Sequence, residues 1–154
     1  MIEVLSNEKM QQFGELLGRA LKGGEIIELV GDVGAGKTTF VRGVARGMEI
    51  EEAVQSPSFT ISHVYEAPDK RRLVHYDFYR LSEPGIMKEE LAETVGSEKT
   101  AVVIEWADSV LEVLPKDRLT ISIMVTGENT RELSLTGSGD AGRRLVEVFD
   151  DNPS

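Results

Sequence analysis

The sequence predicts an α/β fold of three layers, in which helices cover a mixed, partly antiparallel sheet. Three observations predict it: an apolar strand that leads into a glycine-rich loop and a helix, a second short apolar strand later in the chain, and two hairpin patterns on either side of that second strand. The 154 residues suffice for one domain with its own hydrophobic core. We expect this domain to span residues 1–150, with a frayed tail at 151–154.

The first part of the chain has the pattern helix, strand, loop, helix. Ser6 can cap a helix in which apolar residues recur at helical spacing, namely Met10, Phe13, Leu17, Ala20 and Leu21. We expect Gly23-Gly24 to end that helix. Residues 25–30 then predict a buried strand, and residues 37–47 predict the helix that leaves the glycine-rich loop.

The middle of the chain predicts a hairpin, a short helix and a strand. Residues 59–66 and 72–79 are rich in β-formers, and the polar turn between them indicates an antiparallel hairpin. A short helix is expected over residues 84–93. Residues 101–104 (AVVI) are expected to form a short buried strand.

The last part predicts a second hairpin and a final helix. Residues 119–125 and 132–135 are apolar or alternate in polarity, and the turn at 127–129 separates them. A helix is expected over residues 140–149. Together with the preceding elements, these assignments complete the α/β pattern with a partly antiparallel sheet.

The composition argues against several classes of protein. The chain has 27 acidic and 17 basic residues, a formal charge of −10, and such a surface repels phosphate backbones, although acidity more commonly serves only solubility. Without cysteine, disulfides and thiolate metal sites are excluded. No apolar run approaches the roughly 18 residues of a membrane helix, and the first residues do not resemble a signal peptide. We therefore expect a cytoplasmic protein with no membrane contact.

The glycine-rich loop is the clearest functional motif. Residues 31–38 match the pattern G-x-x-x-x-G-K-[ST] at every fixed position. Glycines let successive backbone N–H groups turn inward around a β-phosphate, and the following helix adds its positive end. Lys37 would reach the β- and γ-phosphates, and the Thr38 hydroxyl would ligate Mg²⁺. The motif predicts a P-loop NTPase-like fold that binds a nucleoside triphosphate; the alternative is a glycine turn without a ligand.

Two acidic residues are candidates to complete the site. Glu105 directly follows the apolar run 101–104, and the carboxyl ends of strands are where α/β sheets bind ligands. Asp77 stands among aromatic and apolar residues, where a carboxylate is costly unless a cation or donor satisfies it. We expect both to complete a catalytic and metal site for hydrolysis. An outward-facing residue or a structural ion pair is the alternative for Asp77, and a structural role remains the alternative for Glu105.

Other residues leave their interpretation open. Residues 56–60 (SPSFT) could sense the γ-phosphate as a switch segment, or form a proline turn with capping hydroxyls. Trp106 could stack on a base or a partner, or pack within the protein. His63 and His75 have no companions at metal-ligand spacing, so we expect both to be surface or sheet-packing residues.

Taken together, these motifs resemble the TsaE (YjeE) family, small bacterial ATPases required for making threonylcarbamoyladenosine in transfer RNA. The resemblance extends from the first predicted helix to the second hairpin. Four segments carry it, at residues 31–39, 56–60, 75–81 and 104–106. The first is shared by many NTPases, whereas all four in this order in so short a chain are specific. The family usually has leucine in place of Val33, and many members carry proline and glutamate in place of Ala107-Asp108.

The resemblance implies site residues, cofactors and partners. The residues that bind ATP would be Gly31, Asp32, Val33, Gly34, Ala35, Gly36, Lys37, Thr38 and Thr39. Lys37, Asp77 and Glu105 would be catalytic, and Thr38 and Glu105 would hold Mg²⁺. The partners would be the TsaD and TsaB proteins, with TsaD transferring the group to tRNA, so this chain would meet tRNA only indirectly. Hydrolysis of ATP, weak without the partners, would reset that complex.

Three other functions fit a phosphate-binding loop. A small P-loop kinase would act on a metabolite, but such enzymes usually carry an arginine-bearing lid, and the arginines of this sequence are scattered. A regulatory GTPase would need an Asn-Lys-x-Asp motif, which the sequence lacks. A scaffold that binds a nucleotide without hydrolysing it is also compatible with the sequence.

Overall fold

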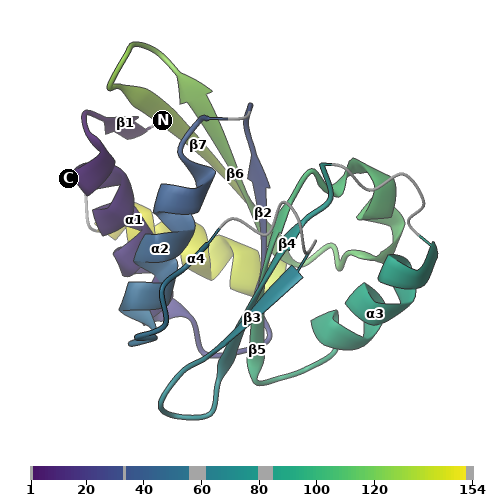
Figure 1. The fold of residues 1–154 in the computed structure, drawn as a ribbon. Coiled ribbons are helices and arrows are strands. Elements are labelled where there is room, and N and C mark those ends of the chain that lie inside the picture. The colour runs from purple at the N-terminus through teal and green to yellow at the C-terminus, as the bar shows by residue number, and fades with distance from the viewer. Residues whose placement is uncertain (1, 33, 56–61, 80–84, 152–154) are drawn as a thin grey trace.

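A computed structural model describes residues 2–32, 34–55, 62–79 and 85–151, which fold into helices on both faces of a seven-stranded sheet (Figure 1). The strands are β1 Ile2–Val4, β2 Ile26–Val30, β3 Ser62–Glu66, β4 Arg72–Asp77, β5 Thr100–Glu105, β6 Arg118–Val125 and β7 Arg131–Ser138. The helices are α1 Asn7–Ala20, α2 Lys37–Gly47, α3 Gly85–Val95 and α4 Gly139–Asp151, with a 3₁₀ helix η1 at Ala107–Val113. The predicted three-layer α/β fold is confirmed.

The sheet is mixed, as predicted, in the order β1-β7-β6-β2-β5-β4-β3. Its centre is parallel, because β2 pairs with β5 and β6 in the same direction, and β4 pairs in parallel with β5. Both predicted hairpins, β3–β4 and β6–β7, are antiparallel. The carboxyl ends of β2, β4 and β5 therefore meet at one edge of the sheet, where α/β folds bind ligands.

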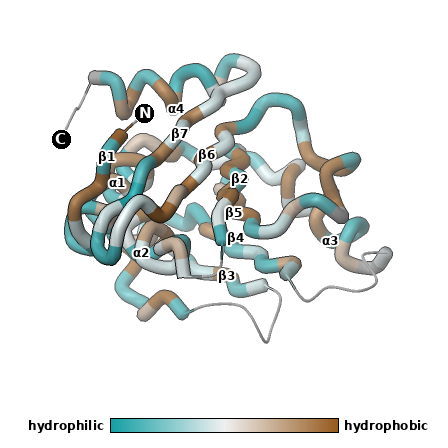
Figure 2. Tube along the Cα trace, turned by 90° about the horizontal axis from the view of Figure 1, so that it is seen from above, coloured by the Kyte–Doolittle hydropathy of each residue, from teal (hydrophilic) through white to brown (hydrophobic). Residues whose placement is uncertain are grey.

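Two apolar clusters fill the layers, one on each face of the sheet. The larger lies under α1, α2 and α4, and the smaller lies under α3 and η1. Figure 1 shows α3 on the opposite side of the sheet from the other three helices. In Figure 2, hydrophobic segments gather along the central strands β2 and β5. The strand β5 is buried along its whole length, as expected for a parallel strand that is covered on both faces.

Helix α1 begins as predicted but ends earlier than predicted. The Ser6 hydroxyl caps it by accepting a hydrogen bond of 3.1 Å from the Lys9 N–H. The helix stops at Ala20, and Leu21 takes an extended conformation that buries its side chain in the core. Gly23 and Gly24, with φ of 112° and 89°, instead turn the chain into β2. The expectation that the glycines end the helix was therefore wrong by a few residues.

Other boundaries differ modestly from the prediction. The short edge strand β1, which pairs with β7, and the 3₁₀ helix η1 were not predicted. Helix α4 continues to Asp151, so the first residue of the expected tail is helical; residues 152–154 lie outside the described chain. Among the described residues, no helix is long and apolar enough to cross a membrane.

Candidate functional site

The glycine-rich loop connects β2 to α2 at the carboxyl edge of the sheet. Gly34 and Gly36 have φ of 84° and 108°, a left-handed conformation that other residues adopt only with strain. The Ala35 N–H donates to the Asp32 carbonyl at 3.0 Å, and the first helical bond of α2 runs from the Phe40 N–H to the Gly36 carbonyl. The helix therefore leaves the amides of its first turn available to an anion.

Arg131, from β7, supports this loop from outside. Its Nε donates to the Ala35 carbonyl at 3.0 Å. Its Nη1 donates to the carbonyls of Gly127 at 3.1 Å and Thr130 at 2.8 Å, in the turn between β6 and β7. One guanidinium thus joins the loop to the second hairpin. In the sequence, Arg131 is one of several scattered arginines, and no pattern predicted this contact.

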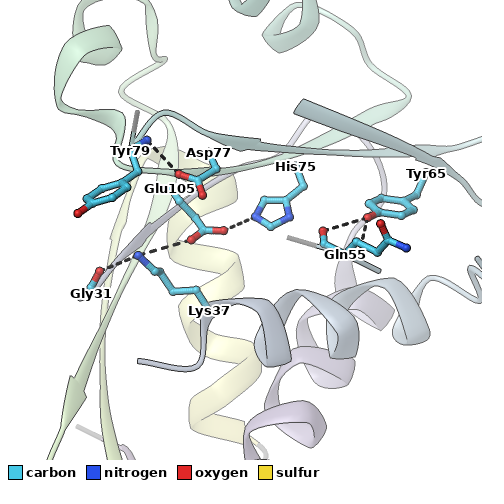
Figure 3. Close-up of polar contacts among 8 residues, drawn as sticks. All are labelled: Gly31, Lys37, Gln55, Tyr65, His75, Asp77, Tyr79 and Glu105. Carbon is cyan, nitrogen blue, oxygen red and sulfur yellow. Dashed lines mark hydrogen bonds and ion pairs between the residues drawn. The ribbon is translucent and has the colours of Figure 1, made fainter. Parts of the chain in front are cut away.

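Lys37, the first residue of α2, is buried, with 6% of its side chain exposed. Its Nζ donates to the Gly31 carbonyl at 2.7 Å and lies 3.5 Å from Glu105 Oε1 (Figure 3). The same atom lies 4.4 Å from the centre of the Trp106 ring, close enough for a cation–π contact. The ammonium group is thereby satisfied within the folded protein, at the mouth of the loop.

Glu105 is the last residue of β5 and is only 4% exposed. Its two carboxylate oxygens have different partners: Oε1 faces Lys37, and Oε2 accepts a hydrogen bond from Nε2 of His75. His75 comes from β4 and is completely buried (Figure 3). Its other ring nitrogen, Nδ1, has no hydrogen-bond partner among the described residues. The three side chains therefore form one buried row of charged and polar groups.

Asp77 lies beside this row, at the end of β4. It is the register partner of Glu105 across the parallel pair, and it is 8% exposed. Its Oδ1 accepts a hydrogen bond of 3.0 Å from the Tyr79 N–H, and the Phe78 N–H donates to the Glu105 carbonyl at 3.1 Å. The structure thus brings both predicted carboxylates to the edge of the sheet that carries the loop. The outward-facing alternative for Asp77 was wrong.

Trp106 follows Glu105 in a left-handed conformation, with φ of 57°. Its ring is partly buried, and it packs against the Tyr79 ring at a centroid distance of 4.8 Å. Asp108, further along, is exposed and lines a shallow hollow of about 160 Å³ with Asp32 and Glu28. The tryptophan is therefore both a packed aromatic and a contact of Lys37.

Some predicted residues are not placed. Val33 and the segment 56–60 lie outside the described chain. Both backbone polar groups of Gln55, the residue before that segment, contact the Tyr65 hydroxyl. The Gln55 N–H donates to this hydroxyl at 3.1 Å, and the hydroxyl donates to the Gln55 carbonyl at 3.4 Å. Burial raises the pKa of the Tyr65 hydroxyl, so it remains a neutral donor.

The position of His75 beside Glu105 was not predicted, although a signal was present. In a strand, residues two apart share a face, so His75 points to the same side of β4 as Asp77. The expectation of surface or sheet packing describes His63, since its ring stacks on Tyr65 and its Nε2 lies 3.1 Å from Glu52. Only one of the two histidines therefore reaches the candidate site.

The donor set suits a magnesium–triphosphate ligand. Backbone amides of the loop and a buried lysine match phosphate oxygens, while hydroxyl and carboxylate oxygens match Mg²⁺. Thr38, in the first turn of α2, and the carboxylates of Glu105 and Asp77 are the residues that could hold the metal. No group of three His, Cys, Asp or Glu side chains that could hold a metal ion occurs among the described residues.

Comparison with known proteins gives a consistent result. Residues 4–133 match the family model described as Threonylcarbamoyl adenosine biosynthesis protein TsaE. The chain is 35% identical over 136 residues to the tRNA threonylcarbamoyladenosine biosynthesis protein TsaE of Streptomyces coelicolor, which covers 85% of this chain and 92% of that protein. It is 34% identical over 145 residues to the protein of the same name from Bacillus subtilis, in an alignment that covers 91% of this chain and 87% of that protein. The crystal structure of Bacillus subtilis YdiB has a TM-score of 0.79 at 31% identity, and the match covers 97% of this chain and 92% of that one.

Proposed function

The chain belongs to the TsaE family of tRNA threonylcarbamoyladenosine biosynthesis proteins, as its motifs predicted, and on that premise we propose that it binds ATP with Mg²⁺ and hydrolyses the ATP. The hydrolysis serves a complex with the TsaD and TsaB proteins, in the cytoplasm. The acidic surface of the chain, with a formal charge of −10, supports indirect contact with tRNA through these partners.

One observation carries the proposal. Lys37, at the end of the glycine-rich loop, is held against Glu105 within a cluster that also contains Asp77. A buried lysine that faces the Glu105 carboxylate, beside a helix whose first amides have no helical partner, fits the coordination of phosphates and metal that ATP hydrolysis needs. Desolvating Lys37 and Glu105 costs free energy that their ion pair offsets only in part, and a site for phosphate and metal accounts for keeping both charges there.

Each residue has a distinct proposed role. Lys37 leaves the Gly31 carbonyl and binds the β- and γ-phosphates, while backbone amides of the loop and of the first turn of α2 surround the β-phosphate. Thr38 and Glu105 would hold Mg²⁺, which would neutralise charge on the phosphates. Asp77 and Glu105 orient the attacking water.

The binding step is tested by calorimetry with MgATP. Lys37→Ala removes the only side chain that the proposal assigns to the phosphates, so we expect its binding to be lost. Glu105→Ala should bind MgATP about as well as the wild type, within about threefold, because the loop and Lys37 remain. Equal affinity in the wild type and Lys37→Ala would refute the assignment of the loop.

The hydrolysis step is tested by phosphate release from the same variants, mixed with TsaD and TsaB. We expect Glu105→Ala to lose turnover by about 100-fold or more, since it removes a group that acts in the transition state. Normal turnover in that variant would remove Glu105 from the mechanism. Phosphate transferred to a metabolite instead of water would establish the kinase alternative, and binding without any release would establish a scaffold.

A further inference from the structure

We propose that His75 is a positioning residue that holds one oxygen of the Glu105 carboxylate and thereby leaves the other oxygen free for the metal or the attacking water. The inference rests on the proposed function, because it concerns how Glu105 is oriented for hydrolysis. It assigns a role to a side chain that the sequence indicated only as a packing residue.

The contact itself is the first support. His75 Nε2 donates to Glu105 Oε2, and both side chains are buried, with the histidine completely inaccessible. A buried carboxylate needs hydrogen-bond donors, so this bond holds the Glu105 side chain in one orientation. The two residues lie on adjacent strands, with His75 paired to Val103, two residues before Glu105. The backbone of the parallel sheet therefore fixes the distance between them.

The two oxygens of Glu105 have unequal partners. Oε2 belongs to His75, whereas Oε1 faces Lys37 Nζ at 3.5 Å, beyond ordinary hydrogen-bond length. Lys37 is held more closely by the Gly31 carbonyl, at 2.7 Å. When Lys37 turns to phosphate, Oε1 loses its distant contact with Lys37, while Oε2 keeps its hydrogen bond with His75. His75 is thus the partner that stays with Glu105 in both states of the site.

The surroundings of the imidazole fit a donor at Nε2. The described residues offer no acceptor to Nδ1, so a hydrogen there would be buried without a partner. A lone pair at Nδ1 and a hydrogen at Nε2 is the arrangement that leaves the fewest groups unsatisfied. The imidazole ring therefore holds one N–H group, at Nε2, against the Glu105 carboxylate.

Two substitutions separate positioning from packing. The side-chain nitrogen of glutamine stands as many bonds from Cβ as Nε2 of histidine does, whereas that of asparagine stands where Nδ1 does. His75→Gln can therefore reach Glu105, and His75→Asn cannot. We expect His75→Asn to lower the kcat of phosphate release about 10- to 100-fold, as loss of an outer hydrogen bond to a ligating group commonly does. The KM for MgATP should change by less than about threefold, and His75→Gln should recover most of the turnover.

The assay is steady-state phosphate release in the mixture with the partner proteins, accompanied by calorimetry with MgADP. Retained MgADP affinity shows that a variant has folded. Because His75 acts through Glu105, the double variant His75→Asn/Glu105→Gln should be no slower than Glu105→Gln alone.

The outcomes distinguish the two proposals. A wild type that neither binds nor hydrolyses ATP would overturn the proposed function. A wild type that hydrolyses ATP, with His75→Asn equally fast, would overturn the role of His75 alone. Parallel losses of MgADP affinity in His75→Asn and His75→Gln would also overturn it, because they would assign the ring to packing of the sheet.

Discussion

Replacing Gly43 by alanine should destabilise the protein, because this glycine lies where α2 packs directly against the backbone of α1. A Cβ atom at Gly43 would lie 2.1 Å from the Gln11 carbonyl oxygen, and one at Gly14 would lie 2.2 Å from the Phe40 carbonyl oxygen. Both neighbours are backbone atoms, so no flexible side chain can move aside. The two helices would have to separate by about 1 Å to restore ordinary contact.

The magnitude follows from two opposing effects. Overpacking of this kind costs about 1–3 kcal/mol, and here the upper part of that range applies because the neighbours are backbone. Alanine is a better helix former than glycine by about 1 kcal/mol, which offsets part of the cost. We expect a net loss of about 2 kcal/mol, which for a domain of this size lowers Tm by about 4–8 °C.

Urea and thermal denaturation of Gly43→Ala measure this loss, and Gly96→Ala is the matched control. A Cβ at Gly96 would meet its nearest atom, the Glu93 carbonyl oxygen, at an ordinary 3.5 Å. The control should stay within about 0.5 kcal/mol of the wild type. If Gly43→Ala were as stable as the control, the close packing of α1 on the helix that carries the phosphate loop would be wrong.

Three further predictions concern buried or half-buried polar groups. Arg131→Met removes the hydrogen bond to the Ala35 carbonyl, so calorimetry should show MgATP affinity reduced by about tenfold, whereas unchanged affinity would show that the loop needs no outside support. Glu25→Gln replaces a buried carboxylate that accepts hydrogen bonds from two backbone N–H groups at 2.7 Å and from Arg144 at 2.9 Å. Urea denaturation should show that the free energy of unfolding falls by about 1–3 kcal/mol, and an unchanged midpoint would contradict this. Burial raises the pKa of the Tyr76 hydroxyl above its ordinary 10.0, so its neutral form adds stability that is present below that pH and is lost as the pH rises through the pKa of the folded protein. Tyr76→Phe should therefore lose stability less steeply than the wild type at alkaline pH. Parallel curves of stability against pH for the two proteins would refute this.

The parts of the site that follow from local sequence were predictable. The turn around Gly34 and Gly36 needs a left-handed backbone conformation, which only glycine adopts freely. The spacing of these glycines in the sequence therefore predicts the turn. Glu105 could be predicted as a candidate because an apolar strand ends at it, and strand ends are where such sheets bind ligands. These features depend on a few neighbouring residues, which is why the sequence carried them.

The parts that follow from pairing between distant segments were not predictable. The three residues of β1 form a strand because they pair with the edge of β7. So short a segment has no hydrophobic periodicity that would predict a strand. The importance of His75 depends on Glu105, which is 30 positions away and becomes its neighbour through the register of β4 and β5. Arg131 meets Ala35 across 96 positions in the same way. Such contacts are set by the fold, and a single sequence does not display them.

The contacts that Lys37 makes within the protein bear on the proposed binding of ATP. Lys37 already has the Gly31 carbonyl, the Glu105 carboxylate and the face of Trp106 as partners. Under the proposed function, a triphosphate replaces these contacts, and its affinity reflects the difference between the two sets of contacts. Lys37 and Glu105 each offset part of the cost of burying the other. In the proposed mechanism, Glu105 keeps His75 as its partner when Lys37 moves to phosphate, and that exchange would link occupancy of the loop to the exposure of one carboxylate oxygen.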